Sequence, residues 1–132
     1  MDNTLTETFG EVIYSYSRAQ AIEDGVLIDM MQEEFREISR SHYKFPIAIT
    51  AAVFAIMEKA VTNPRCSNDY KGVWHDMLWM SRVMKRKVDE STILFRVKIK
   101  GTGHKSLFDF KMVCGPGDNA KPVMTIMLPN ED

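Results

Sequence analysis

The chain has 132 residues, a net charge of −1, 45% hydrophobic residues and two cysteines. This length predicts a single domain over residues 1–132, and the hydrophobic fraction is enough for a core without a disulfide framework. The N-terminus lacks the basic start and apolar run of a signal peptide, and no apolar stretch approaches the ~18 residues of a membrane span. We therefore expect a cytoplasmic protein that does not enter membranes.

The charged residues are distributed unevenly. Residues 1–40 carry nine acidic and three basic side chains, a net charge of −6, whereas residues 82–111 carry three acidic and nine basic ones, a net charge of +6. Such a separation could steer a charged partner to one end of the protein. It could equally reflect two solvated faces whose charges balance each other.

In chain order, the polar residues 1–8 are expected to form a loose tail. Residues 12–16 are β-branched and aromatic with one serine, which is typical of a short strand. Ser17 follows at the N-cap position of a predicted helix over residues 19–23. Gln20, three residues later, completes a capping box.

A second strand and a longer helix come next. Gly25 is placed to end the first helix in the left-handed conformation, and residues 26–28 follow as an apolar strand. An amphipathic surface helix is predicted over residues 30–43, because apolar residues recur there at helical spacing beside an acidic face. Pro46 interrupts this pattern, and residues 45–49 alternate as a short extended link.

Two further helices are predicted in the middle of the chain. Thr50 is a candidate N-cap for residues 51–61, which are apolar almost all round, so this helix should be buried on most sides. Residues 70–87 carry an apolar stripe at steps of three and four and end in four basic residues, which suit the negative end of a helix dipole. Trp79 lies off this stripe and is either half buried or exposed.

The last third of the chain is predicted to form a three-stranded meander. Residues 93–99 and 108–114 alternate between apolar and mostly polar side chains, and residues 123–128 form the closing strand. The turns fall at residues 101–106 and 115–122. We therefore predict an α+β fold in which this meander, plus one or both N-terminal strands, forms an antiparallel sheet packed against about three helices.

A basic surface in the C-terminal half is the strongest functional hint. Arg96, Lys98 and Lys100 share one face of a predicted strand and could bind phosphates in a salt-dependent manner. However, no aromatic residue is interleaved among these three to stack on bases, and no known DNA-binding motif is recognised. Solvated lysines on an edge strand would also discourage aggregation. The full candidate set is Arg82, Lys85, Arg86, Arg96, Lys98, Lys100, Lys105 and Lys111.

The turn containing Gly115, Gly117 and Asp118 is a second candidate site. Two glycines around a proline could point successive backbone N–H groups at an anion. The same residues also make ordinary tight connections between strands. Arg18, on the first helix, could pair with Asp24, with Asp29 or with an external phosphate.

Catalytic and metal-binding patterns are weak. His75 and Asp76 are adjacent and would point from different faces of a helix, and the other histidines and cysteines stand alone in sequence, so we expect no metal and no cofactor. Cys66 could meet His75 across a loop as a nucleophile with its base, which leaves a small enzyme with an unrecognised site as one alternative. Cys114 alternates onto the core face and is expected to be inert.

Four sequence blocks together resemble one family. They are YSYSRAQAIEDGVLID (residues 14–29), FPIAITAAVF (45–54), WHDMLWMSRV (74–83) and VCGPGDNAKPVMTIMLPNED (113–132). The family is an uncharacterised bacterial domain family carried largely on plasmids, integrative elements and phages, and the resemblance extends over about residues 12–132. It contributes no catalytic residues, and residues 65–69 and 87–92 depart from its pattern.

The resemblance implies an accessory protein of a mobile genetic element. The leading hypothesis is a non-catalytic phage or plasmid protein that binds a host protein or nucleoprotein complex. One concrete form of this hypothesis is an inhibitor of a bacterial defence system such as CRISPR or restriction. The alternative is a nucleic-acid-binding accessory protein that uses the basic surface. Either could be a monomer or a homodimer.

Overall fold

The computed structural model of the chain describes residues 16–132. The predicted tail, and the predicted strand over residues 12–16 except its last residue, lie outside this part. In chain order the elements are α2 (Arg18–Glu23), β2 (Leu27–Asp29), α3 (Glu33–His42), β3 (Ile47–Thr50), α4 (Ala51–Val61), α5 (Tyr70–Val83), β4 (Lys85–Asp89), β5 (Thr92–Lys98), β6 (Leu107–Pro116) and β7 (Pro122–Met127). Within the described residues, no helix is long and apolar enough to cross a membrane.

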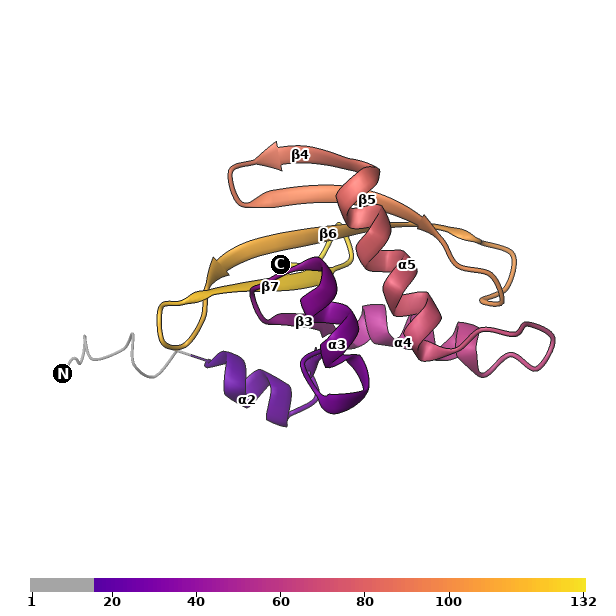
Figure 1. Cartoon of the computed structure of the whole chain (residues 1–132), viewed down its shortest axis with the longest axis horizontal. Helices are drawn as coiled ribbons and strands as arrows, with labels where there is room; N and C mark the ends of the chain where they lie inside the picture. Colours follow the sequence, from indigo (N-terminus) through magenta and orange to yellow (C-terminus); the bar gives the residue numbers. More distant parts are fainter. Residues whose placement is uncertain (1–15) are drawn as a thin grey trace.

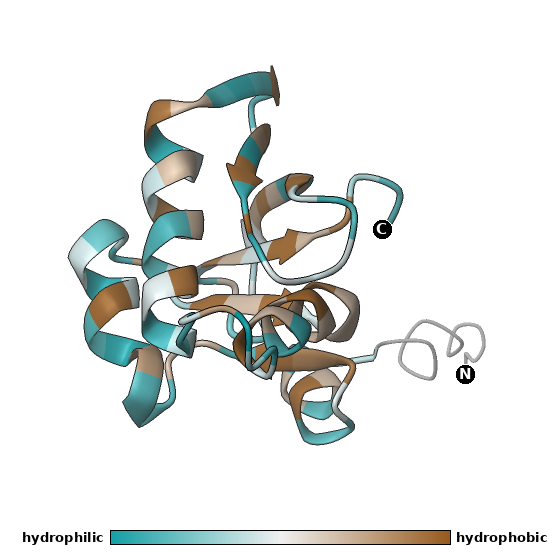
Figure 2. Ribbon diagram, turned by 90° about the vertical axis from the view of Figure 1, so that its right-hand side faces the viewer, coloured by the Kyte–Doolittle hydropathy of each residue, from teal (hydrophilic) through white to brown (hydrophobic). Residues whose placement is uncertain are grey.

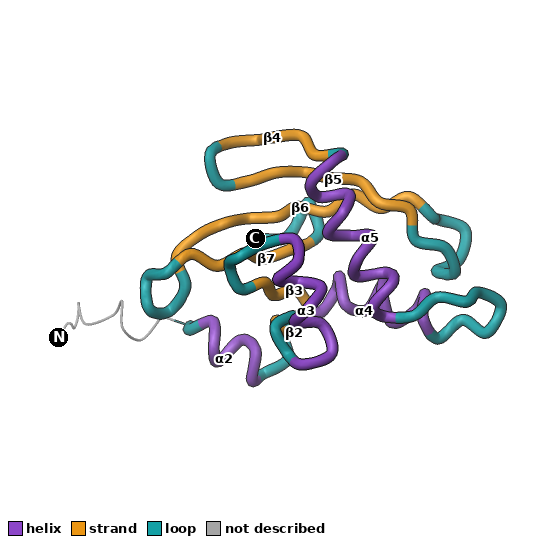
Figure 3. Tube along the Cα trace, in the orientation of Figure 1, coloured by secondary structure: helices purple, strands orange, loops and turns teal. Residues whose placement is uncertain are grey.

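The six strands form one mixed sheet in the order β2-β3-β7-β6-β5-β4 (Figure 1). Neighbouring strands are antiparallel, except for β3 and β7, which run parallel. The predicted α+β class is confirmed, as is the meander β5–β6–β7. Both N-terminal strands of the described residues, β2 and β3, extend the meander at one end, and β4 extends it at the other (Figure 3).

The N-terminal helix forms as its capping residues predict. Ser17 Oγ accepts a hydrogen bond from the Gln20 backbone N–H, while the Gln20 side chain accepts one from the Ser17 backbone N–H. Each end of the box therefore satisfies an N–H group that the helix leaves without a partner. Gly25 has a φ of 79°, the left-handed conformation that ends α2 before β2 begins.

The segment predicted as an extended link is an interior strand of the sheet. All four residues of β3 are buried, and the strand pairs with β2 along one edge and with β7 along the other. Ile47 and Ile49 belong to the main hydrophobic cluster, and Ala48, on the other face, is only 1% exposed. A strand covered on both faces loses the alternation that marks an exposed strand, so a four-residue run is difficult to recognise.

The helix predicted over residues 70–87 ends four residues earlier. α5 stops at Val83, Met84 leaves the helical conformation with φ −124° and ψ 42°, and the following five residues form β4. A tight turn joins β4 to β5, in which Asp89 Oδ1 accepts a hydrogen bond from the Ser91 backbone N–H. Pairing with β5 outweighs the favourable position of cations at a helix C-terminus, which is a weak effect.

Helices α3, α4 and α5 pack on one face of the sheet and share one hydrophobic cluster with it. Figure 2 shows hydrophobic residues on the strands and on parts of the helix surfaces. α4 is buried along one side only: Val53, Met57 and Ala60 are buried, but Ala51 and Ala55 are exposed. The expectation that this helix is buried on most sides is therefore wrong. Its outer surface consists of alanines and other side chains that face solvent.

The opposite face of the sheet is covered near β3 and β7 by α2 and by the C-terminal segment. Arg18 Nη1 donates a hydrogen bond to Thr125 Oγ1 at 2.8 Å. Thr50 Oγ1 donates to a Glu131 carboxylate oxygen at 2.7 Å, and that oxygen also accepts from the Leu128 backbone N–H. Two segments that lie at opposite ends of the described chain therefore shield the same half of the sheet.

A buried polar network connects α3 to α5. The Trp74 indole N–H donates to Ser39 Oγ at 3.0 Å, and Ser39 Oγ donates to the Met30 carbonyl at 2.7 Å. All three residues are fully buried. Met30 lies before α3, which begins at Glu33 rather than at residue 30 as predicted. One hydroxyl thus satisfies both the indole N–H and the carbonyl that the β2–α3 connection places in the core.

Replacing Ser39 with alanine is expected to lower the free energy of unfolding by about 2–4 kcal/mol, because it leaves a buried N–H and a buried carbonyl without partners. Urea unfolding followed by circular dichroism measures this difference. Ser41→Ala is the matched control in the same helix, since the Ser41 hydroxyl is exposed and donates only to the Ile38 carbonyl. Equal effects of the two substitutions would contradict the structural role of Ser39.

Candidate functional site

The eight basic residues of the predicted surface do not form one surface. Lys85 pairs with Phe95, so its side chain lies on the helix-covered side of the sheet, whereas Arg86 pairs with Leu94 and lies on the opposite side. Both residues belong to β4, not to the last helical turns where they were expected. Because side chains alternate along a strand, the pairing divides the basic residues between two faces.

On the face opposite the helices, much of the basic charge is already paired. Arg96 makes two hydrogen bonds to Asp109, at 2.7 and 3.2 Å, which raise the pKa of Arg96 and lower that of Asp109. Lys111 donates to the Glu131 carbonyl. Arg86 remains beside this pair, at a shallow cavity of about 270 Å³. This face therefore presents less free positive charge than the sequence suggests.

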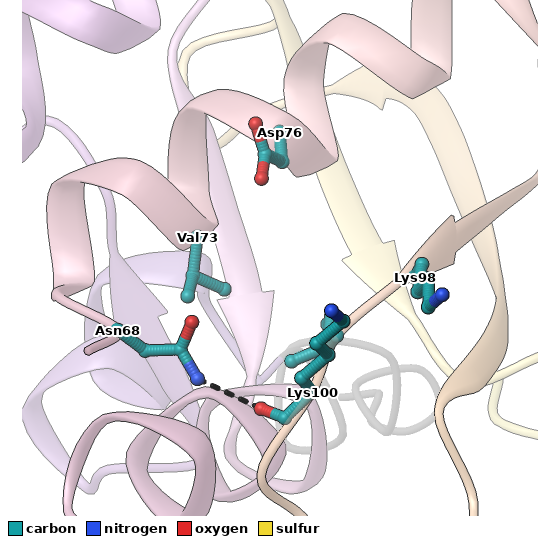
Figure 4. Close-up of a pocket in the computed structure, with 6 residues that line it drawn as sticks. Asn68, Val73, Asp76, Lys98 and Lys100 are labelled. Atoms are coloured by element: carbon teal, nitrogen blue, oxygen red, sulfur yellow. Dashed lines mark hydrogen bonds between the residues drawn. The ribbon is translucent and has the colours of Figure 1, made fainter. Parts of the chain in front are cut away.

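Lys98 and Lys100 line a different cavity, of about 200 Å³, between β5 and α5. Figure 4 shows the two lysines on the strand side and Asp76 on the helix side. Asn68 Nδ2 donates to the Lys100 carbonyl at 2.8 Å and so ties the loop before α5 to the end of β5. The two lysines therefore share this cavity with an acidic side chain, whose charge offsets part of theirs.

The remaining predicted basic residues, Lys105 and Arg82, lie apart from this cavity. Lys105 Nζ lies 5.1 Å from the centre of the Phe108 ring, a cation–π contact in the β5–β6 connection. Arg82 is on the outer side of α5, where Arg82 Nη1 is 3.2 Å from His42 Nδ1. Arg82 thus belongs to a group of side chains that the sequence patterns did not bring together.

That group is an aromatic and histidine cluster where the end of α3 meets α5. The rings of His75 and Trp79 are stacked, with an angle of 12° between their planes and 6.4 Å between their centres. His42 packs edge-on against both, at 5.1 Å from His75 and 6.4 Å from Trp79. Trp79 is 50% exposed. The cluster therefore presents a half-exposed indole that its neighbours hold in place.

A signal for this cluster was present in the sequence. His75 and Trp79 are four residues apart, so they lie above one another on a helix, on a face away from the buried residues of α5. The contribution of His42 depends on how α3 packs against α5, and sequence spacing does not reveal that contact. The sequence marks Trp79 as unusual but does not associate it with either histidine.

The cluster continues into a segment without a single buried residue. Residues 82–90 are all exposed, including the apolar side chains of Val83 (52%) and Met84 (61%). Figure 2 shows the end of α5 and β4 extending away from the rest of the protein. We call the following residues the α5–β4 surface: His42, His75, Trp79, Arg82, Val83, Lys85 and Lys87. Met84 is not part of it, because Met84 lines the cavity beside Arg86 and Arg96 on the opposite face.

A groove beside β4 connects the lysines of this surface to α3. It has a volume of about 230 Å³, and Tyr43, Lys85 and Lys87 contribute to its walls together with Asp89 and Glu90. Tyr43 immediately follows His42, and its hydroxyl shares a 2.7 Å hydrogen bond with the buried Ser81 hydroxyl. The end of α3 therefore has the histidine cluster on one side and the two lysines on the other.

Local charge affects the titration of His42. Partial burial lowers the pKa of His42, and the neighbouring His75 and Arg82 lower it further because their positive charges disfavour an imidazolium. A neutral His42 can accept a hydrogen bond at Nδ1, which agrees with its contact with the Arg82 guanidinium. Arg82 therefore contributes a permanent positive charge beside His42.

The turn with Gly115, Gly117 and Asp118 has an internal partner. The two Asp118 carboxylate oxygens accept hydrogen bonds from the backbone N–H groups of Arg18 and Ala19, at 2.8 and 3.0 Å. These bonds lower the pKa of Asp118. The turn predicted to bind an anion thus places its own carboxylate, that of Asp118, at the start of α2. Its glycines lie in the chain reversal between β6 and β7.

The Arg18 side chain also bonds within the protein. Its guanidinium donates to Thr125 Oγ1 and to the Met124 carbonyl, each at 2.8 Å. Burial lowers the pKa of Arg18, and the negative charges of Asp29 and Asp118 oppose that effect. Of the partners expected for Arg18, Asp29 therefore acts through its charge, while Asp24 accepts a hydrogen bond from the Tyr16 hydroxyl.

The cysteines and the histidine considered for catalysis pack against other parts of the fold. Cys66 lies in the loop between α4 and α5, where its sulfur is near Gly101, whereas His75 packs against Trp79 and His42. No hydrogen bond joins Cys66 to His75 in the described part of the chain. Cys114 packs against the main hydrophobic cluster. Within residues 16–132, no three His, Cys, Asp or Glu side chains are grouped so as to hold a metal ion.

Comparison with known protein families matches the whole chain to one family. The model of a family described as a family of unknown function (DUF6573) matches residues 1–132. No curated protein and no solved structure matches the chain.

Asp118→Asn is expected to lower the melting temperature at pH 7, because it removes a negative charge from the N-terminus of α2. The folded pKa of Asp118 lies below its usual 3.8, so the stabilisation is present above that value and is lost as the pH falls through the folded pKa. The difference from the wild type, measured by thermal unfolding, should therefore shrink as the pH falls below 3.8 and disappear once Asp118 is protonated in the folded protein. Glu37→Gln, an exposed change in the middle of α3, is the control. A difference independent of pH would contradict this role.

Arg82→Met is expected to raise the pKa of His42 toward its usual 6.5, since one of the charges that lower it is removed. NMR titration of the imidazole resonances measures the shift, with His104 in the β5–β6 connection as an internal control. In the wild type the unfolded chain binds a proton at His42 more readily than the folded protein, so this residue makes stability fall as the pH drops below 6.5. An unchanged His42 titration would show that the contact with Arg82 is absent in solution.

Proposed function

Because the chain belongs to this family of unknown function (DUF6573), we propose a function from its surface: it is a non-catalytic binding protein whose partner contacts the α5–β4 surface. The observation that carries the proposal is the run of nine exposed residues from 82 to 90, next to the half-exposed Trp79. All five residues of β4 are exposed although the strand is paired with β5.

The composition of this surface supports a macromolecular partner. Single exposed apolar side chains are common on monomeric proteins, but here Trp79 and Val83 lie one turn apart at the end of one helix. Tryptophan and arginine are enriched at the centres of protein interfaces, where a few such residues supply most of the binding energy. Arg82 and the two lysines of β4 surround the apolar residues with positive charge and so favour an acidic partner.

The biological setting is proposed from the four sequence blocks. Their resemblance to a family carried on plasmids, integrative elements and phages supports an accessory protein of a mobile element. A host nucleoprotein complex is an acidic partner of the required kind, and occupying its surface would inhibit it without any catalysis. Inhibition of a defence system of the CRISPR or restriction type is the concrete form of this proposal.

This function predicts that phage or plasmid DNA survives better in cells that contain such a defence system and express the protein. Trp79→Ala/Val83→Ala should reduce that protection by at least about tenfold, since two exposed residues at the centre of this surface are truncated. The plating efficiency of a susceptible phage, with and without the defence system, measures the effect. The same double variant should fail to capture from host lysate the complex that the wild type captures.

The matched control is Val26→Ala/Leu107→Ala, which truncates two residues exposed to a similar extent, 51% each, away from the α5–β4 surface. It should protect as well as the wild type. Equal loss in both double variants would show that the effect is general, and protection unaffected by the Trp79 variant would remove the α5–β4 surface as the contact.

A further inference from the structure

We propose that the α5–β4 surface binds single-stranded nucleic acid, with a base stacked on Trp79 and phosphates bound by Arg82, Lys85 and Lys87. This inference rests on the proposed function, because it names the chemistry of the partner at the same surface. The nucleic acid would be the exposed strand of a nucleoprotein complex or a free strand.

Trp79 provides an aromatic platform. A base stacks on an exposed aromatic face, and any base can do so because every base has a π-face. Trp79 offers such a face, since it is half exposed, with His75 stacked on it and His42 against it edge-on. These contacts restrict the indole before binding, so less side-chain freedom is lost when a base stacks on it.

The cations of β4 are placed to bind the phosphates of the same strand. Lys85 and Lys87 both lie on the helix-covered side of β4, because they pair with Phe95 and Ile93. Two residues apart on a strand, they are separated by about 6.6 Å along it, a spacing similar to that of neighbouring phosphates on an extended strand. The groove that they line is bordered by Tyr43, the residue after His42. Tyr43 and His42 thus separate the lysines from the rings at the end of α3, and Asp89 and Glu90 share the groove with the lysines.

These cations make few ion pairs within the described residues. Among the described residues, the ion pair on this surface joins Lys87 to Glu90 at 3.6 Å, and Glu90 is almost fully exposed. Arg82 contacts His42, which is not an anion, and Lys85 makes no ion pair within residues 16–132. By contrast, Arg96 on the other face is fully engaged with Asp109.

A single strand fits this surface better than a duplex. In a duplex the bases are stacked on one another, so only an unpaired base can present its face to Trp79. An acidic peptide is the competing ligand, because lysines beside the apolar groove would also suit acidic and apolar side chains. The stacked rings favour a nucleic acid, and the two ligands can be separated by direct binding measurements.

The test uses the full chain and four labelled probes: 12-residue oligothymidine, 12-residue oligouridine, a DNA duplex of the same length and an oligoglutamate peptide. Fluorescence anisotropy at low salt gives the affinities, and the quenching of tryptophan fluorescence reports stacking. The two tryptophans are distinguishable, because Trp74 is fully buried and only Trp79 is accessible to a base. We expect both single strands to bind and to quench, with the duplex and the peptide binding at least about tenfold more weakly.

Variants then locate the site. Trp79→Ala and Lys85→Glu/Lys87→Glu should each weaken single-strand binding by at least about tenfold, and Trp79→Phe should restore most of it, because a phenyl ring still stacks. The lysine variant should also lower the slope of log affinity against log salt by about 0.7 for each phosphate that it no longer neutralises. Lys98→Glu/Lys100→Glu changes the charge by the same amount outside this surface and should weaken binding by less than about threefold at moderate salt.

The inference is overturned if neither single strand binds, or if the peptide or the duplex binds as tightly as the single strands. It is also overturned if Lys85→Glu/Lys87→Glu and Lys98→Glu/Lys100→Glu lose affinity equally. Its failure is separable from that of the proposed function. If host capture depends on Trp79 but no oligonucleotide binds, the surface serves a protein partner and this inference is wrong. If oligonucleotides bind through Trp79 but defence and host capture are unaffected, the inhibitor function is wrong and nucleic-acid binding stands.

Discussion

The parallel pairing of β3 with β7 is the constraint on which the rest of the structure depends. It joins residues 47–50, early in the chain, to residues 122–127 near its end, and it places a fully buried strand inside the sheet. A strand with apolar side chains on both faces must be covered on both, because exposing either face to water is unfavourable. Helices α3 to α5 cover one face, and α2 with the C-terminal segment covers the other. Arg18 and Glu131 make the hydrogen bonds that attach these two segments.

The same arrangement explains the position of the α5–β4 surface, which we propose as the binding surface. The covering elements concentrate on the β3–β7 end of the sheet, and β4, at the other end, has all of its residues exposed. β4 pairs with β5 along one edge, and its cations discourage uncontrolled pairing along the other. α5 reaches from the core to this end, with Trp74 fully buried and Trp79 half exposed. One helix therefore links the buried polar network around Ser39 to the exposed aromatic platform.

Electrostatics also differ between the two faces of the C-terminal half. On the face opposite the helices, the Arg96–Asp109 pair and the contact from Lys111 to the Glu131 carbonyl use positive charge to stabilise the fold. On the helix-covered side, Arg82 and Lys85 make no ion pair within residues 16–132, and Lys87 pairs with the exposed Glu90. The net charge of +6 over residues 82–111 is thus a sum over two surfaces with different roles, and only one of them combines free cations with an exposed aromatic ring.

Local sequence determined the capped helix α2 at Ser17, the helix that starts after Thr50 and the alternating strands of the meander, because capping and periodicity act between residues close in the chain. Sequence also located positive charge in the C-terminal half. Only the tertiary structure decided that α5 ends at Val83, that β3 is a buried strand, that Asp118 caps α2, and that His42 meets Trp79. Each of these depends on contacts between residues distant in sequence or on strand pairing that outweighs a local preference. Residue spacing within a single segment does not predict such contacts.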